Sequence, residues 1–174
     1  MGAMVMHRWI ARTQHVRRIA ILLIAAVGVA MLAISASADA RLVWNFTPSV
    51  PTGLYSIEDS PWGRGDRVAL KPSGVLLETL QKSGVLKEGR LLMKRVAAVA
   101  GDRVCRVGQQ VSVNGLASAV ARDDESLPAW SGCLWLEAEE VFLLGETDDS
   151  FDGRYFGVSS ALDVVGPVRS LLTF

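Results

Sequence analysis

Histidine is almost missing from this sequence, and its two copies lie together near the N-terminus. The 174-residue chain contains His7 and His15 and no histidine after them. Everything beyond residue 18 therefore lacks the side chain that most often activates nucleophiles and ligates catalytic zinc. If this remainder is an enzyme, a Ser-His-Asp triad, a Cys-His pair and a histidine-ligated zinc are excluded.

Cysteine is equally scarce. Cys105 and Cys133 are the only two, and they do not form a C-x-x-C redox or metal motif. In an oxidising compartment, a bond between them would close a loop of about 28 residues and stabilise the fold by about 3–4 kcal/mol. The alternative is a pair of unbonded cysteines in the core. No motif in the sequence predicts a metal or a cofactor.

A strong net charge is also absent. The formal net charge is +0, 21% of the residues are charged and 50% are hydrophobic, which argues against a disordered chain and against a nucleic-acid partner. The balance conceals an asymmetry, because residues 1–18 contain no acidic side chain and four arginines. These are Arg8, Arg12, Arg17 and Arg18.

A long apolar stretch follows this basic tail. Residues 19–38 carry no charge, and a helix of this length is about 30 Å long, the thickness of the hydrocarbon core of a bilayer. Arginines before the stretch place that end in the cytoplasm. The predicted organisation is a cytoplasmic tail (1–18), a transmembrane anchor (19–38) and a periplasmic domain (39–174). Such a protein crosses the bacterial inner membrane once and contacts its lipids.

A cleaved secretory signal is the alternative for the same stretch. Ala36-Ser37-Ala38 and Ala38-Asp39-Ala40 both resemble cleavage sites of the A-x-A type. However, the uninterrupted apolar run over residues 19–34 is longer than the apolar core of about 7–15 residues in most secretory signals. We therefore favour a retained anchor, and under either interpretation the domain is exported.

The exported domain is predicted to be mostly β, because short apolar runs alternate with turns rich in Gly, Pro and Asp. Asn114-Gly115 directly follows one such run and predicts a hairpin turn. One helix is expected over Gly74–Ser83, with an apolar face that begins at Val75, and residues 121–131 are expected to form a loop. The predicted strands are Leu54–Ile57, Arg67–Leu70, Arg90–Val99, Arg103–Val107, Gln110–Val113 and Glu140–Leu144.

Without histidine, a serine nucleophile in this domain would need a lysine or a carboxylate as its base. Lys94 is the one lysine of the domain inside a strand pattern, where alternation places Leu92, Lys94 and Val96 on one face. Burial lowers the pKa of a lysine from about 10.4 toward neutrality, and a neutral amine can deprotonate a serine hydroxyl. The alternative is a lysine that reaches the surface from an edge strand.

A stiff loop after the apolar stretch contains a serine. Pro48 and Pro51 flank Ser49 and restrict the backbone, and Gly53 permits a sharp turn before the next strand. The pattern predicts an exposed loop that presents the Ser49 hydroxyl. Taken alone, a proline-rich loop of this kind is also typical of a simple spacer.

Three segments together resemble the signal peptidase I superfamily, and most closely its conjugative-transfer branch, the TraF-type peptidases. They match the S-x-P-x-G-hydrophobic-Tyr, K-R-x₅-G-D and S-x-D-x-R-Y-F-G boxes of that branch. Ordinary signal peptidases have Met after the nucleophile and Ser between the Asp and Arg of the last box, where this chain has Val50 and Gly153. The segments are Ser49-Val50-Pro51-Thr52-Gly53-Leu54-Tyr55, Lys94-Arg95 with Gly101-Asp102, and Ser150-Phe151-Asp152-Gly153-Arg154-Tyr155-Phe156-Gly157.

The resemblance implies a role for each residue of these boxes. Ser49 would be the nucleophile, and Lys94 the general base and later the general acid. The backbone N–H of Ser49 and the hydroxyl of Thr47 would form an oxyanion hole. Ser150 would form a hydrogen bond with the lysine amine and aim it at Ser49.

The last box also carries two opposite charges. The resemblance implies that Asp152 and Arg154 form a supporting ion pair, and it leaves open a more direct catalytic role for Asp152. The segment between Lys94 and Ser150 is short, so the large additional domain of housekeeping signal peptidases is missing.

The implied fold is a signal-peptidase-like β domain after one transmembrane helix, and the implied function is that of a membrane-anchored serine endopeptidase. Its substrate would be a pilin precursor or another preprotein of conjugative transfer, cleaved at the periplasmic face. The product would be cyclic if the substrate's own amino terminus, rather than water, attacked the acyl-enzyme. One alternative is a general signal peptidase that acts on many secreted preproteins. Another is a non-enzymatic, anchored β-domain that binds pilus-assembly components.

Overall fold

The computed structural model describes residues 17–28, 41–84 and 90–174. The chain divides into two units, Met1–Ala40 and Arg41–Phe174. In the first unit, residues 17–28 are helical. No helix among the described residues has both the length and the apolar character needed to cross a bilayer. The remainder of the predicted anchor and most of the predicted cytoplasmic tail lie outside the described residues.

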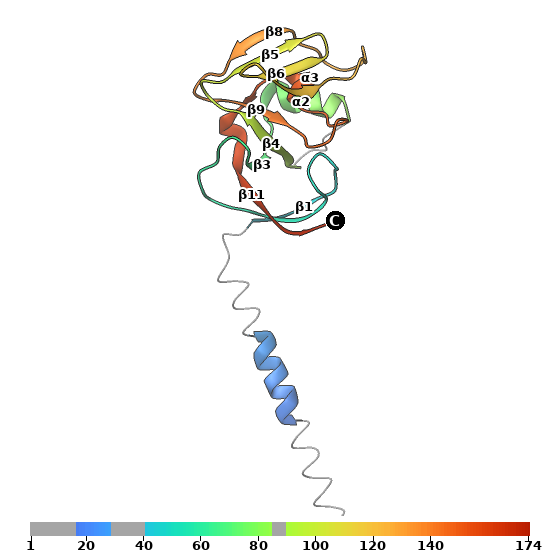
Figure 1. Ribbon diagram of the computed structural model, residues 1–174. Helices are drawn as coiled ribbons and strands as arrows, with labels where there is room; N and C mark the ends of the chain where they lie inside the picture. The colour runs from blue at the N-terminus through green and yellow to red at the C-terminus, as the bar shows by residue number, and fades with distance from the viewer. Residues whose placement is uncertain (1–16, 29–40, 85–89) are drawn as a thin grey trace, which may run out of the picture. The chain divides into compact units, whose positions relative to one another are not determined.

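The second unit consists of two antiparallel sheets (Figure 1), so the prediction of a mostly β domain is confirmed. The larger sheet has seven strands in the order β1-β2-β11-β3-β4-β9-β10, and the smaller has four in the order β7-β6-β5-β8. The smaller sheet lies at the end of the domain opposite β1 and the C-terminus. The strands are β1 Arg41–Asn45, β2 Gly53–Ile57, β3 Arg67–Leu70, β4 Leu92–Ala98, β5 Arg103–Val107, β6 Gln110–Val113, β7 Leu116–Val120, β8 Gly132–Trp135, β9 Glu140–Leu144, β10 Ser159–Ser160 and β11 Val164–Thr173.

All six predicted strands are present, as are the hairpin turn at Asn114-Gly115 and the loop over residues 121–131. Five further strands were not predicted. β7 and β8 are edge strands with largely exposed side chains, so no apolar alternation marks them. β11 contains Gly166-Pro167 and two register irregularities, and such a sequence is more typical of a break between strands.

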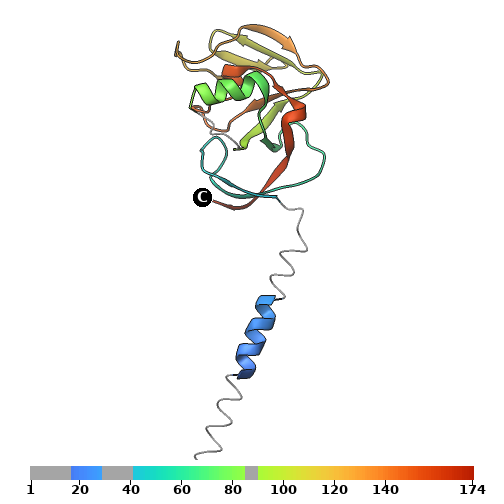
Figure 2. The ribbon, with the colours of Figure 1, turned by 180° about the vertical axis from the view of Figure 1, so that it is seen from behind.

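The predicted helix is present as α2, Gly74–Lys82, and Figure 2 shows it across the body of the domain. Leu80 is buried, and Leu76 and Leu77 pack against the core formed by β3, β4 and β9. The predicted apolar face of this helix began at Val75, and this was wrong, because Val75 is 80% exposed. Successive residues of a helix are rotated by about 100°, which turns Val75 to solvent when Leu76 faces the core. Two short helices follow later in the chain, α3 Gly153–Phe156 and the 3₁₀ helix Ala161–Asp163.

One buried cluster joins the Ser49 loop to the larger sheet. Val50 and Met93 both belong to it, together with residues of β2 and β3. Burial of an apolar side chain of this size contributes about 1.5–3 kcal/mol. Because Val50 follows Ser49 and Met93 precedes Lys94, this packing brings two distant parts of the sequence together.

Candidate active site

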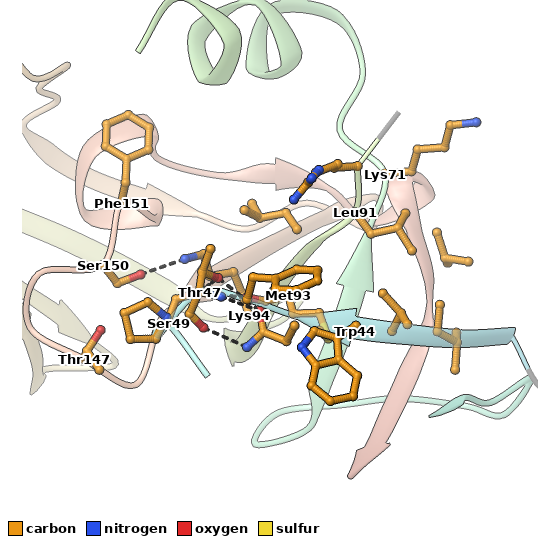
Figure 3. A pocket seen from close by; sticks show the side chains of 18 of the residues that line it. Trp44, Thr47, Ser49, Lys71, Leu91, Met93, Lys94, Thr147, Ser150 and Phe151 are labelled. Carbon is orange, nitrogen blue, oxygen red and sulfur yellow. Dashed lines mark hydrogen bonds between the residues drawn. The ribbon is translucent and has the colours of Figure 1, made fainter. Parts of the chain in front are cut away.

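A groove of about 700 Å³ brings the three motif segments together. Its walls come from β1, from the Ser49 loop, from β4 and from the loop that contains Ser150. Figure 3 shows Thr47, Ser49 and Lys94 close together in the lining, with Ser150 on the side opposite Lys71. The structure therefore places four of the residues singled out by the sequence at one site.

The Ser49 loop is held in shape by side chains that bind its backbone. The Tyr55 hydroxyl donates a hydrogen bond of 2.6 Å to the Pro51 carbonyl. Asn45 was not recognised from the sequence, although an amide between a strand and a proline-rich loop often binds nearby backbone groups. Its Nδ2 donates to three carbonyl oxygens of the loop, those of Thr47 at 2.7 Å, Val50 at 2.9 Å and Pro51 at 3.1 Å.

The expectation that Ser49 is exposed was wrong, since only 6% of this residue is exposed. Its hydroxyl donates to the carbonyl of Met93 at 3.5 Å, and its own carbonyl accepts a hydrogen bond of 2.7 Å from the backbone N–H of Glu146. The neighbouring Val50 is fully buried in the core. The loop is therefore drawn inward at Ser49 and Val50, and Ser49 lines the groove.

Thr47 lies where the nucleophile hydroxyl can reach it. The two hydroxyl oxygens, Oγ1 of Thr47 and Oγ of Ser49, are 3.3 Å apart. The Thr47 hydroxyl also donates to Oδ1 of Asn45 at 3.1 Å, which fixes its position. Its role in an oxyanion hole stays a prediction.

Lys94 lies inside the sheet and not at its surface. It is 2% exposed, on a strand with β3 on one side and β9 on the other, so the alternative of an edge-strand lysine is wrong. Its Nζ donates a hydrogen bond of 2.7 Å to Oγ of Ser150. Burial lowers the pKa of Lys94 to about 8. The charge of Asp152 opposes this shift, whereas the charge of Arg154 adds to it. A substantial share of this amine is thus neutral in mildly alkaline solution.

Two glycines permit close approaches around the groove. Gly53 has a φ of +144°, and a Cβ there would lie 2.0 Å from the carbonyl oxygen of Leu172. Gly145, which follows β9, was missed in the sequence. A Cβ at this position would lie 2.0 Å from Oγ of Ser150 and 3.2 Å from Cβ of Ser49. Only glycine leaves room for both serines beside this backbone.

Asp152 and Arg154 form a buried ion pair behind the groove and do not line it. Their side chains are 0% and 2% exposed, and two hydrogen bonds of 2.9 Å join the guanidinium to the carboxylate. Asp152 also accepts a bond of 2.7 Å from the N–H of Gly145. Arg154 donates to the carbonyls of Thr147 and Asp148 at 3.0 and 2.7 Å. The pair therefore anchors the loop that carries Ser150.

Cys105 and Cys133 are disulfide-bonded, as the first of the two interpretations predicted. They occupy paired register positions of β5 and β8 in the smaller sheet. Neither residue lines the groove, so the bond is a structural element of the smaller sheet.

Comparison with known proteins places these residues in a family. The model of the family described as signal peptidase, peptidase S26, matches residues 12–173. The chain belongs to this family. It is 33% identical over 162 residues to plasmid transfer protein TraF of Escherichia coli, covering 84% of this chain and 92% of that one. It is 35% identical over 169 residues to a probable conjugal transfer protein TraF of Sinorhizobium fredii, covering 85% and 89%.

Among solved structures, that of a signal peptidase I from Enterococcus faecalis is similar to this chain, with 17% sequence identity and a TM-score of 0.40. The match covers 64% of this chain and 100% of that one. The resemblance read from the three boxes is confirmed by the family match and by the conjugal transfer relatives. Membership of the S26 signal peptidases supports a serine peptidase role for this chain.

Proposed function

We propose that this protein is an endopeptidase with a Ser/Lys dyad, in which Ser49 is the nucleophile and Lys94 the general base. The observation that carries the proposal is the buried Lys94 amine, whose pKa is lowered to about 8, in the same groove as the Ser49 hydroxyl. The hydrogen bond to Ser150 fixes the position of this amine. A neutral amine held beside a serine hydroxyl is the arrangement that nucleophilic catalysis without histidine requires.

Catalysis begins with a proton transfer from Ser49 Oγ to the neutral Nζ of Lys94. For this step the serine hydroxyl turns away from the Met93 carbonyl that it contacts in the structure. Oγ then forms a bond to the carbonyl carbon of the scissile peptide, and the carbonyl electrons move to oxygen. When this oxyanion collapses, the C–N bond breaks, and the Lys94 ammonium gives its proton to the departing amine.

The developing oxyanion needs hydrogen-bond donors on the Ser49 side of the groove. The backbone N–H of Ser49 and the Thr47 hydroxyl are the proposed pair, and the 3.3 Å between the two hydroxyl oxygens supports this assignment. Loss of one such donor lowers kcat by about 10²–10³-fold in enzymes of this kind. Thr47→Val, which keeps the size of the side chain, is the appropriate variant.

The proposed substrate is a pilin precursor or another membrane-bound preprotein of a conjugative apparatus. The names of the two relatives, which refer to plasmid and conjugal transfer, support this choice. The proposed location is the periplasmic face of the inner membrane. Attack of water on the acyl-enzyme gives a linear product, whereas attack of the substrate's own amino terminus gives a cyclic one.

Co-expression with a pilin precursor tests the proposal. Ser49→Ala and Lys94→Ala should each abolish maturation while the protein accumulates at the wild-type level. Lys82→Ala is the matched control, because this lysine is exposed on α2 outside the groove. Normal maturation in the presence of Lys94→Ala would exclude the dyad.

Two further readings of the same experiment separate the alternatives. Mass spectrometry of the mature product distinguishes a linear from a cyclic chain, since cyclisation removes one water relative to hydrolysis. Processing of many unrelated preproteins would favour a general signal peptidase. Maturation that does not depend on Ser49 or Lys94 would favour an anchored β-domain without catalytic activity.

A further inference from the structure

The groove that holds Ser49 continues to a cluster of positive charge at its far end. Arg41, Lys71 and Arg90 all line it, whereas Asp149 is its one acidic lining residue among the described residues. Asp149 is the neighbour of Ser150, at the opposite end. Figure 3 shows Lys71 at one end of the lining and Ser150 at the other, with the Ser49 region between them.

The strand register explains why these charges come together. β3 and β4 are antiparallel, and Leu70 pairs with Leu92. Lys71, the residue after Leu70, therefore lies across from the segment that contains Arg90. Arg41 begins β1, whose residues line the groove on its other side.

The Arg90 guanidinium lies near an aromatic ring. The carbon at the centre of its guanidinium lies 5.8 Å from the centroid of the Phe46 ring, a distance at which the ring attracts a cation. Among the described residues, Arg64, Arg67, Lys82 and Arg154 form ion pairs, and none of the three cluster residues does. All three side chains line the groove.

The path from the serine to the cluster is lined by apolar side chains. Trp44, Leu91 and Met93 are among them, and Figure 3 shows all three on this side of Ser49. Arg90 precedes Lys94 by four residues, which corresponds to about 13 Å in an extended chain at about 3.3 Å per residue. A substrate peptide that is also extended covers this distance with about four residues.

We propose that the groove selects precursors with an acidic side chain about four residues from the scissile bond. This inference rests on the function proposed above and adds a specificity to the same site. A carboxylate there would lie near three exposed cations, Arg41, Lys71 and Arg90, which attract it. Glutamine has the same shape without the charge, so a Glu-to-Gln exchange in the substrate isolates the electrostatic contribution.

The full-length protein in detergent, with synthetic precursor peptides, tests this specificity. Peptides carry Glu or Gln at each position out to six residues on either side of the cleavage site, and kcat/KM is measured for each. At one position about four residues away, we expect Glu to be about tenfold better than Gln. Arg90→Gln and Lys71→Gln should each reduce this ratio to about threefold or less, and added salt should reduce it as well.

Lys82→Gln is the control, because this exposed lysine lies on α2 outside the groove, and it should leave the Glu/Gln ratio unchanged. Arg90→Lys keeps the charge and should retain much of the preference. The inference is overturned if no position prefers Glu, or if the preference survives in both glutamine variants. Binding of the same variants to anionic phospholipid vesicles is measured in parallel. If Arg90→Gln and Lys71→Gln weaken vesicle binding but leave the Glu/Gln ratio of kcat/KM unchanged, the cluster binds lipid headgroups, and the inference is also overturned.

Failure of the specificity is distinguishable from failure of the proposed function. Cleavage that requires Ser49 but shows no charge preference refutes only the specificity. If no peptide is cleaved, the affinity of Ser49→Ala protein for fluorescent Glu and Gln peptides still tests the cluster. Equal affinities for the two peptides would then refute the specificity, and tighter binding of the Glu peptide would support it.

Discussion

The Lys94 amine donates a hydrogen bond of 2.7 Å to the Ser150 hydroxyl, across 56 residues of sequence. Both residues are buried, at 2% and 5% exposure. The lysine is thus neither a surface charge nor free to move, and its protonation is set by the interior of the protein. Three of the following predictions concern this amine.

Activity should rise with pH through the pKa of Lys94. Burial lowers this pKa to about 8, and only the neutral amine accepts the serine proton. kcat/KM should therefore increase from about pH 6, reach half of its maximum near pH 8 and level off above it. Peptide cleavage measured from about pH 6 to 10 checks this. A flat profile over that range would contradict the role of Lys94 as base.

Ser150→Ala should shift that profile as well as slow the reaction. The Ser150 oxygen accepts a hydrogen bond from the lysine, which stabilises the protonated amine, so its removal should lower the pKa of Lys94. We expect a midpoint below pH 8 and a kcat about 10–100-fold lower, because the amine loses its orientation.

Ser118→Ala is the matched control, since this exposed hydroxyl binds only the nearby Leu116 carbonyl. It should leave both the midpoint and kcat unchanged. A purely structural role of Ser150 would reduce the amount of folded enzyme without moving the midpoint.

Asp152→Asn should cost stability and also shift the pH profile. The variant leaves the buried Arg154 without its counter-charge, which lowers the free energy of unfolding by about 3–5 kcal/mol. The Asp152 charge raises the pKa of Lys94, so its removal should move the midpoint to lower pH. Urea denaturation followed by tryptophan fluorescence, together with the pH profile, measures both effects.

Glu146→Gln provides the comparison, because the Arg67–Glu146 ion pair is solvent-accessible and is worth about 0–1 kcal/mol. If Asp152→Asn leaves stability intact and lowers kcat by more than about 10³-fold at every pH, Asp152 has a direct catalytic role instead of a supporting one.

Removal of the disulfide should destabilise the domain but leave kcat nearly unchanged. The bond joins residues 28 apart in the sequence, and a loop of this size predicts a loss of about 3–4 kcal/mol in Cys105→Ala/Cys133→Ala. Since neither cysteine lines the groove, kcat at low temperature should change by less than about twofold. The unreduced wild type and the wild type treated with a thiol reductant are the references. A large loss of kcat in stably folded variant protein would contradict this assignment.

Local patterns in the sequence are sufficient for much of the fold. Alternation, turn residues and β-branched runs predict β3, β5, β6 and β9 at their observed bounds, because each pattern reports the faces of one strand. The motif serine and lysine are identified from the resemblance of three sequence boxes to a known family, each box being a short local pattern. The strand pattern around Lys94 left two possibilities open, burial or an edge strand, and only the position of β4 between β3 and β9 decided for burial.

Other features depend on contacts between distant segments. The sequence does not reveal that Val50 draws Ser49 into the core, or that Asn45 binds three carbonyls of the loop. Nor does it reveal that Gly145 leaves room for two serines. β11 forms despite Gly166-Pro167, since it lies between β2 and β3 and pairs with both.

The chemistry available to this protein was determined by its composition and its motifs. With histidine confined to the N-terminal tail, a lysine or a carboxylate was left as the base for a serine nucleophile, and the motif resemblance pointed to Lys94. The tertiary structure decided the pKa and the position of that lysine, because burial, Asp152 and Arg154 set its pKa and Ser150 accepts its hydrogen bond. These groups lie more than 50 residues further along the chain, and only folding brings them to the amine.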